Sequence, residues 1–160
     1  MSHPSPTEAA RSRASPPEPV THEVEIEVRY AETDQMGIVH HRNYLVWYEL
    51  ARTGLCAETG FPYHEIEKLG VMLVVTRTET RYLAPAHYGD RVRVSCKLEK
   101  LQSRGLRFSY EVHLAAGQRE PGLVLAAGAT DHIWVDSEHR RPCRLPEVLR
   151  QPFRRAAGLE

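Results

Sequence analysis

A helix that is apolar on nearly every side constrains the fold of this chain more than any other feature. Its residues at helical spacing are Tyr44, Trp47, Tyr48, Ala51 and Leu55, and Leu45, Val46 and Leu50 widen the apolar surface nearly all round. We expect such a helix to be buried, with a sheet wrapped around it. Gly60 and Pro62 end the helix, and residues 64–69 are expected to form a short second helix closed by Gly70.

Five segments carry the patterns of β-strands. Residues 22–30, before the helix, alternate apolar with charged side chains, and residues 91–98 and 106–114 alternate apolar with polar ones. Residues 71–83 are rich in β-branched side chains, and residues 122–135 are apolar on both faces, as a central or interface strand would be. The connections are short, so consecutive strands are expected to pair antiparallel. One long helix and an antiparallel sheet predict an α+β fold.

The length of 160 residues fits one domain. Residues 1–20 are rich in Pro, Ser, Ala and Arg, and we expect them to form a disordered tail. The folded domain is expected to span residues 21–153, with a short closing helix over residues 147–150. Residues 154–160 are expected to fray.

The charges and the cysteines bear on the compartment and the partners. Lys plus Arg equals Asp plus Glu, at 21 each, so no net field favours nucleic acid or an anionic membrane as a partner. Cys56, Cys96 and Cys143 are far apart and lack CxxC spacing, which indicates reduced thiols and no structural zinc. No apolar run approaches the length of a bilayer-spanning helix, and the N-terminus lacks the apolar core of a secretory signal. We expect a cytoplasmic protein that works without a metal or redox cofactor.

The boundary between the first strand and the long helix carries the clearest chemical signal. Asp34 is followed by the flexible Gly37 and then by the helix start, whose free amides can polarise a carbonyl. An acyl carbonyl that becomes tetrahedral needs a nucleophile on one side and hydrogen-bond donors on the other. This arrangement indicates an acyl-transfer site. The alternative is that Asp34 only caps a turn, as aspartates in loops usually do.

Three separated segments agree in order and spacing with one known family. They are Tyr30-x-Glu-Thr-Asp34-x-x-Gly37-Ile-Val-x-His41-x-x-Tyr44, Trp47-Tyr48-Glu49-x-Ala51-Arg52 and Tyr82-x-Ala84-Pro85-x-x-x-Gly89-Asp90. From about Val24 to Pro146 the chain resembles the hotdog-fold acyl-CoA thioesterases of the 4-hydroxybenzoyl-CoA thioesterase and YbgC-like group.

The resemblance implies a fold, an assembly and roles for particular residues. It implies a five-stranded antiparallel sheet wrapped around one long central helix, in a homodimer or homotetramer with active sites at the subunit interface. Asp34 would act on an acyl-CoA thioester as nucleophile or as base toward water, releasing the acid and coenzyme A. The amide near His41 or Arg42 would be the oxyanion donor, and Gly37 would lie beside the substrate.

Other polar side chains have competing interpretations. His41 could hydrogen-bond the thioester oxygen or orient water, or it could be an exposed loop residue. We do not expect His40 and His41 to bind a metal together, because adjacent residues rarely converge and no third ligand is evident. Glu49 is the reserve catalytic carboxylate; the alternative is an ion pair with Arg52, three residues further on.

The substrate contacts and the reaction also have alternatives. Tyr44 and Tyr48, with Trp47, could line an acyl slot, although aromatic residues at helical spacing are more often core. Arg104 and Arg107 suit the phosphates of coenzyme A, or they form a solvated basic face. A hydratase or dehydratase of acyl thioesters is the first rival function, and a non-catalytic scaffold that binds acyl thioesters is the second. The acyl group and its carrier, coenzyme A or acyl carrier protein, are not readable from the residues.

Overall fold

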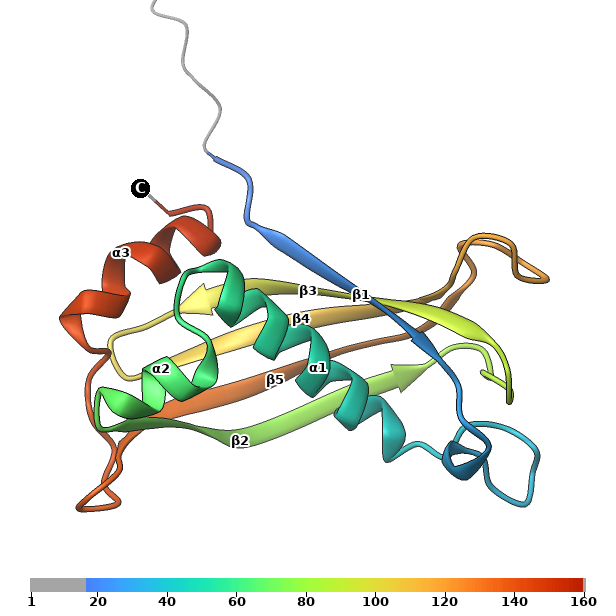
Figure 1. Cartoon of the computed structure of the whole chain (residues 1–160), viewed down its shortest axis with the longest axis horizontal. Helices are drawn as coiled ribbons and strands as arrows, with labels where there is room; N and C mark the ends of the chain where they lie inside the picture. Colours follow the sequence, from blue (N-terminus) through green and yellow to red (C-terminus); the bar gives the residue numbers. More distant parts are fainter. Residues whose placement is uncertain (1–16, 160) are drawn as a thin grey trace, which may run out of the picture.

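The computed structural model describes residues 17–159 as one antiparallel sheet with helices on one side. The strands are β1 (Thr21–Glu27), β2 (Val71–Tyr82), β3 (Arg91–Leu101), β4 (Gly105–Leu114) and β5 (Val124–Asp136), in the order β1-β3-β4-β5-β2. The long helix α1 (Asn43–Glu58) lies along one face of the curved sheet (Figure 1). The structure confirms the predicted α+β fold with five strands around one long helix.

The packing of α1 on the sheet forms the centre of the core. Its side chains that face the sheet are fully buried: Tyr44, Trp47, Tyr48, Ala51, Leu55 and Cys56. The ring of Tyr48 stacks on Tyr110 of β4 with 4.2 Å between centroids. A Cβ at Gly128 of β5 would lie 2.7 Å from the Tyr48 hydroxyl, so only a glycine leaves room for this ring. The helix therefore sits close against the middle of the sheet.

The opposite side of α1 is open in the single chain, contrary to the expectation that the helix is buried nearly all round. Leu45, Val46 and Leu50 are 38%, 48% and 48% exposed. The sheet covers only one face of α1, and no other described element lies over these three residues. On the neighbouring edge of the sheet, β2 pairs only with β5, so its other edge is unpaired.

One predicted strand ends earlier than expected, and the doubly apolar strand lies where its pattern predicts. The first was expected to reach residue 30, but β1 ends at Glu27, and Tyr30 begins the 3₁₀ turn η1 (Tyr30–Glu32) with an exposed ring. Alternation alone cannot detect that the chain leaves the sheet while apolar residues continue. The doubly apolar segment is β5, which pairs with β4 and β2 on its two sides. Its pattern therefore reflects a central position in the sheet.

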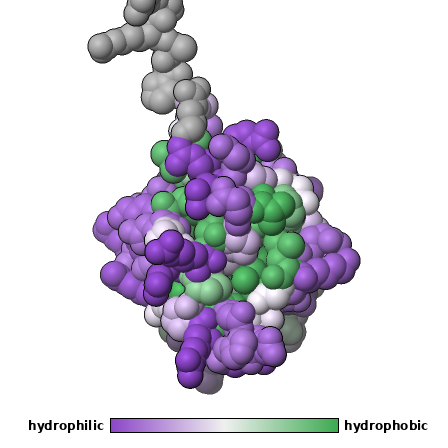
Figure 2. Space-filling model, turned by 90° about the vertical axis from the view of Figure 1, so that its left-hand side faces the viewer, coloured by the Kyte–Doolittle hydropathy of each residue, from purple (hydrophilic) through white to green (hydrophobic). Residues whose placement is uncertain are grey.

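Two shorter helices close one end of the molecule. The predicted second helix is α2 (Tyr63–Lys68), and the closing helix α3 (Glu147–Ala156) is longer than predicted, running three residues into the segment expected to fray. Phe153 and Ala156 of α3 are buried, which explains why the helix continues past Pro152. Figure 2 views this end, where hydrophilic side chains surround a central group of apolar ones. Residues 1–16 of the predicted tail lie outside the described residues.

No helix in the described part of the chain is long and apolar enough to cross a membrane.

A chain of polar groups runs through the core beneath α1. The Tyr110 hydroxyl lies 2.7 Å from Thr130 Oγ1, which lies 2.8 Å from His132 Nε2. His132 is buried, and its Nδ1 has no hydrogen-bond partner among the described residues. Burial, assisted by the positive charge of Arg52, lowers the pKa of His132 to about 4. This imidazole is therefore neutral in the folded protein at physiological pH.

We predict that His132 makes folding stability fall as the pH drops from about 6.5 to about 4. In this window the unfolded chain takes up a proton that the folded chain does not, so acid favours unfolding, by up to about 3 kcal/mol. Denaturant unfolding at several pH values should show a shallower pH dependence for His132→Gln than for the wild type. The exposed His64 supplies the control, and His64→Gln should keep the wild-type slope. Equal slopes for all three proteins would contradict this assignment.

Candidate active site

A tight turn between β1 and α1 presents Asp34. Thr33 and Val39 form an isolated antiparallel bridge at the base of the turn, and the Asp34 amide donates to the Ile38 carbonyl at 3.0 Å. The Gly37 amide donates to the Asp34 carbonyl at 2.9 Å, and Gly37 has a φ of 76°, which favours glycine. The predicted bend at Gly37 is therefore the device that turns the chain back toward α1.

The carboxylate of Asp34 is held by one oxygen. Oδ1 accepts the Met36 amide at 2.8 Å, so the turn-capping interpretation correctly describes one of its contacts. No donor from residues 17–159 reaches Oδ2 within hydrogen-bond distance. The turn thus orients the carboxylate and leaves one of its oxygens available for chemistry.

The start of α1 supplies an available amide. The Arg42 amide donates to His40 Nδ1 at 3.2 Å, and the Asn43 and Tyr44 amides donate to the His40 and His41 carbonyls. The His41 amide has no acceptor within the described chain. Of the two amides that the sequence suggested as donors, the one at His41 is therefore the free one.

The segment that follows β2 holds the Asp34 turn in place through backbone hydrogen bonds. The Val39 amide donates to the Ala86 carbonyl at 2.9 Å, and the Val28 amide donates to the Asp90 carbonyl at 2.8 Å. The carboxylate of Asp90 accepts the His87 amide, which closes this segment on itself, and the Arg119 guanidinium, which joins it to the connection between β4 and β5. These contacts explain why the third sequence motif accompanies the Asp34 segment.

Asp34 borders an open cleft of about 390 Å³. The lining is mostly apolar and consists of Asp34, Met36, Ile38, Val39, His41, Tyr44, Tyr82, Leu83, Ala84 and Pro85. The Tyr44 and Tyr82 rings meet edge to face at 5.1 Å, and the Tyr82 hydroxyl donates to the His41 carbonyl. Burial raises the pKa of Tyr44 to about 12, so its hydroxyl stays neutral. The cleft offers an apolar wall beside one carboxylate, as an acyl group requires.

Two other predicted site residues on α1 lie away from this cleft. Tyr48 is buried against Tyr110 and does not line it, so its ring serves the core. Glu49, expected to be buried, has a side chain that is 65% exposed, because it points away from the sheet. Its carboxylate accepts Arg52 Nη2 at 3.2 Å, which is the ion pair that the sequence offered as the alternative to a catalytic role.

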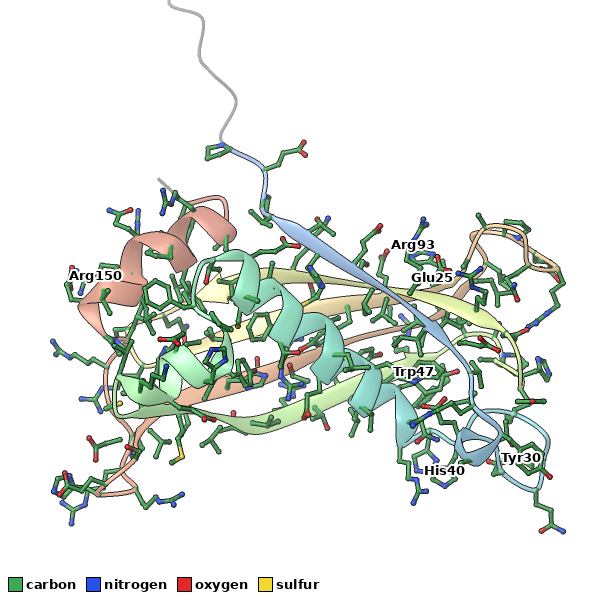
Figure 3. The ribbon with its side chains drawn as sticks, viewed as in Figure 1. Glu25, Tyr30, His40, Trp47, Arg93 and Arg150 are labelled. Carbon is green, nitrogen blue, oxygen red and sulfur yellow. The ribbon has the colours of Figure 1, made fainter. Side chains whose placement is uncertain are left out.

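The predicted phosphate-binding arginines lie toward the other end of the sheet from Asp34. Arg104 is in the turn between β3 and β4, whereas the Asp34 turn lies beyond the start of α1 (Figure 1). Arg107 is already surrounded by anions, since its guanidinium contacts Glu79, Glu99 and Asp131. Figure 3 shows the same separation, with Tyr30 and His40 at one end and Arg150 at the other.

The sequence interpretation missed a group of residues that hold the turn against α1. Glu32 is buried, and its carboxylate accepts the Trp47 indole N–H at 3.0 Å. Asn43 is also buried and donates to the Glu32 carbonyl at 2.7 Å. The available signal was a glutamate two residues before Asp34, followed by an indole on the buried face of the helix. No three His, Cys, Asp or Glu side chains within residues 17–159 are grouped to hold a metal ion.

Comparisons with known proteins identify the family to which this chain belongs. Residues 28–153 match the model of the Thioesterase-like superfamily. YneP of Bacillus subtilis (strain 168), named as a proposed acyl-CoA thioesterase, is 44% identical over 78% of this chain and 87% of its own length. The crystal structure of hypothetical protein TT1821 from Thermus thermophilus has a TM-score of 0.74 and 39% identity, covering 87% of this chain and 99% of that one. A DHNA-CoA thioesterase from Staphylococcus aureus has a TM-score of 0.71 and 33% identity, covering 78% and 80%.

Proposed function

Since this chain belongs to the thioesterase-like superfamily of hotdog-fold proteins, we propose that it hydrolyses an acyl-CoA thioester to the free acid and coenzyme A. The observation that carries the proposal is that two groups lie at one apolar cleft: the Asp34 carboxylate, and the His41 amide, which has no hydrogen-bond acceptor among the described residues. The names of YneP and the Staphylococcus aureus relative support this chemistry.

In the proposed mechanism the acyl group lies against the apolar wall with its carbonyl at the start of α1. The free oxygen of Asp34 attacks the carbonyl carbon or takes a proton from an attacking water. The His41 amide donates to the oxygen that becomes negative, assisted by the dipole of α1. The intermediate then collapses and expels the coenzyme A thiolate. If water attacked, the acid forms directly and the proton held by Asp34 passes to the thiolate. If Asp34 attacked, the acyl group remains on Asp34 as a mixed anhydride, and water hydrolyses it, which releases the acid, restores the Asp34 carboxylate and supplies the proton that the thiolate takes up.

We also propose that two copies of the chain associate through β2 and the open side of α1. The outer edge of β2 is unpaired, and this strand carries the exposed Val74 and Val75, while Leu45, Val46 and Leu50 of α1 form a second exposed apolar group. Antiparallel pairing of two β2 strands across a two-fold would bring the start of one strand beside the end of the other. The Arg104 end of one copy would then approach the Asp34 end of its partner.

We predict that Asp34→Asn lowers kcat at least about a hundredfold and leaves the fold intact, because an amide can neither attack nor act as a base. Thiol release should be measured over short, long, branched and aromatic acyl-CoAs. Glu49→Gln makes the same chemical change on α1 and should leave turnover within a few-fold of wild type. Near-normal turnover by Asp34→Asn would exclude the proposed role and direct attention to Glu49.

The interface proposal predicts that Leu50→Glu produces monomers, because each interface would bury the new carboxylate without a partner. Sedimentation at micromolar concentration should show oligomers for the wild type and a shift to monomer for the variant. Val148→Glu places the same charge at an exposed apolar position of α3 and should sediment as wild type does. A wild-type protein that is monomeric and active would contradict the proposal.

If Arg104 of a partner subunit meets coenzyme A, Arg104→Ala should raise KM for acyl-CoA with little change in kcat, and high salt should reduce the difference. An N-acetylcysteamine thioester lacks the nucleotide and should show no such change. Equal losses on both substrates would place the nucleotide elsewhere. Arg107→Ala should instead lower stability, because it leaves three carboxylates without their shared cation.

A further inference from the structure

A buried carboxylate lies two residues before Asp34 and takes no part in the proposed chemistry. Glu32 is 3% exposed, yet three donors reach its oxygens: Trp47 Nε1 at 3.0 Å, the Arg29 amide at 2.8 Å and Arg29 Nη2 at 3.2 Å. Burial is the strongest influence and raises its pKa, but these donors together outweigh burial and hold the pKa below its usual value. Glu32 is therefore an anion inside the protein at neutral pH.

The backbone of the same residue makes two further bonds. The Glu32 carbonyl accepts Asn43 Nδ2 at 2.7 Å and the His40 amide at 2.9 Å. Asn43 and Trp47 are one turn apart on α1, so the side chain and the carbonyl of Glu32 form hydrogen bonds with the same face of the helix. Figure 3 shows Trp47 toward the end of the molecule where Tyr30 and His40 lie.

These bonds join the two arms that carry the proposed reacting groups. On one arm, only Thr33 separates Glu32 from Asp34. On the other arm, the amide that bonds to Glu32 is that of His40, and the next amide along the chain is the free one of His41. A shift of Glu32 would therefore move both the carboxylate and the oxyanion donor.

We propose that Glu32 is a positioning residue for the reaction: it fixes the separation between the Asp34 carboxylate and the His41 amide by tying both arms of the turn to α1. The inference rests on the proposed function.

Stability alone does not explain a charge at this position. A buried ion pair is often no more stabilising than well-packed apolar side chains of similar volume, because both charges lose their hydration. The carboxylate adds a geometric constraint that apolar packing lacks, because each donor must lie within about 3 Å of one of its oxygens. Its donors are Arg29, the residue before η1, and Trp47 of α1, so these hydrogen bonds fix the position of η1 relative to α1.

The test compares kcat and KM of Glu32→Gln and Trp47→Phe with those of the wild type. Gln has the shape of Glu but turns an amide NH2 group toward one of the donors, and Phe removes the indole N–H while keeping an aromatic ring. We expect kcat to fall about tenfold to a hundredfold for Glu32→Gln and by less for Trp47→Phe, with KM nearly unchanged, since a misplacement of about 1 Å has effects of this size. Trp47→Phe keeps the proposal testable if Glu32→Gln does not fold.

The control separates positioning from stability. Phe153→Leu weakens the core under α3, at the other end of the molecule, and should lower Tm without changing kcat at temperatures where it is folded. If Glu32→Gln and Trp47→Phe also lose Tm but keep kcat within about twofold of wild type, Glu32 is only structural and the inference is overturned. Asp34→Asn is measured in the same assay. If Asp34→Asn loses turnover while Glu32→Gln and Trp47→Phe keep it, only the positioning role of Glu32 is excluded. If Asp34→Asn keeps normal turnover, the proposed function is excluded as well.

Discussion

The burial of α1 against the middle of the sheet is the interaction on which the rest of the structure depends. The aromatic residues Tyr44, Trp47 and Tyr48 on its buried face set the depth at which the helix lies. That depth fixes where the helix begins, and its first turn is one half of the candidate site. The other half, the Asp34 turn, reaches the same place because Glu32 is bonded to two residues on that buried face, Asn43 and Trp47. Core packing and site geometry are therefore set by the same side of one helix.

Local patterns predicted the fold well because each element has a regular relation to the sheet. Alternation located β3 and β4, helical spacing located α1, and the doubly apolar pattern located the central strand β5. The errors fall where long-range contacts decide the outcome. Alternation persisted beyond Glu27 although the chain had left the sheet, and α3 continued through Pro152 because Phe153 packs on Trp134 at 5.8 Å. Neither the end of β1 nor the continuation of α3 can be recognised from the neighbouring residues in the sequence.

The geometry of the candidate site was predictable in part, and here too the residues that local patterns missed are those whose burial depends on long-range contacts. Asp34 and Gly37 could be found because a carboxylate, a positive-φ glycine and a helix start have recognisable residue types and spacing. Glu32 could not be recognised from periodicity, because a glutamate in a loop is usually solvated and only its indole and amide donors make burial favourable. Similarly, Glu49 looked buried because the helix is apolar all round. The sequence could not show that one side of that helix is left uncovered by its own chain.

That uncovered side links the chemistry to assembly. The cleft beside Asp34 is open, and Tyr82 and Leu83 on its rim, at the end of the edge strand β2, are about half exposed. An acyl thioester held in such an open cleft would remain in contact with bulk water, where one amide donor has little effect on a developing charge. Whatever covers β2 and α1 would also lower the dielectric at the His41 amide and confine water to the position beside Asp34. The apolar surface through which we propose that a second copy binds is thus also the surface whose burial would make the carboxylate and the amide effective.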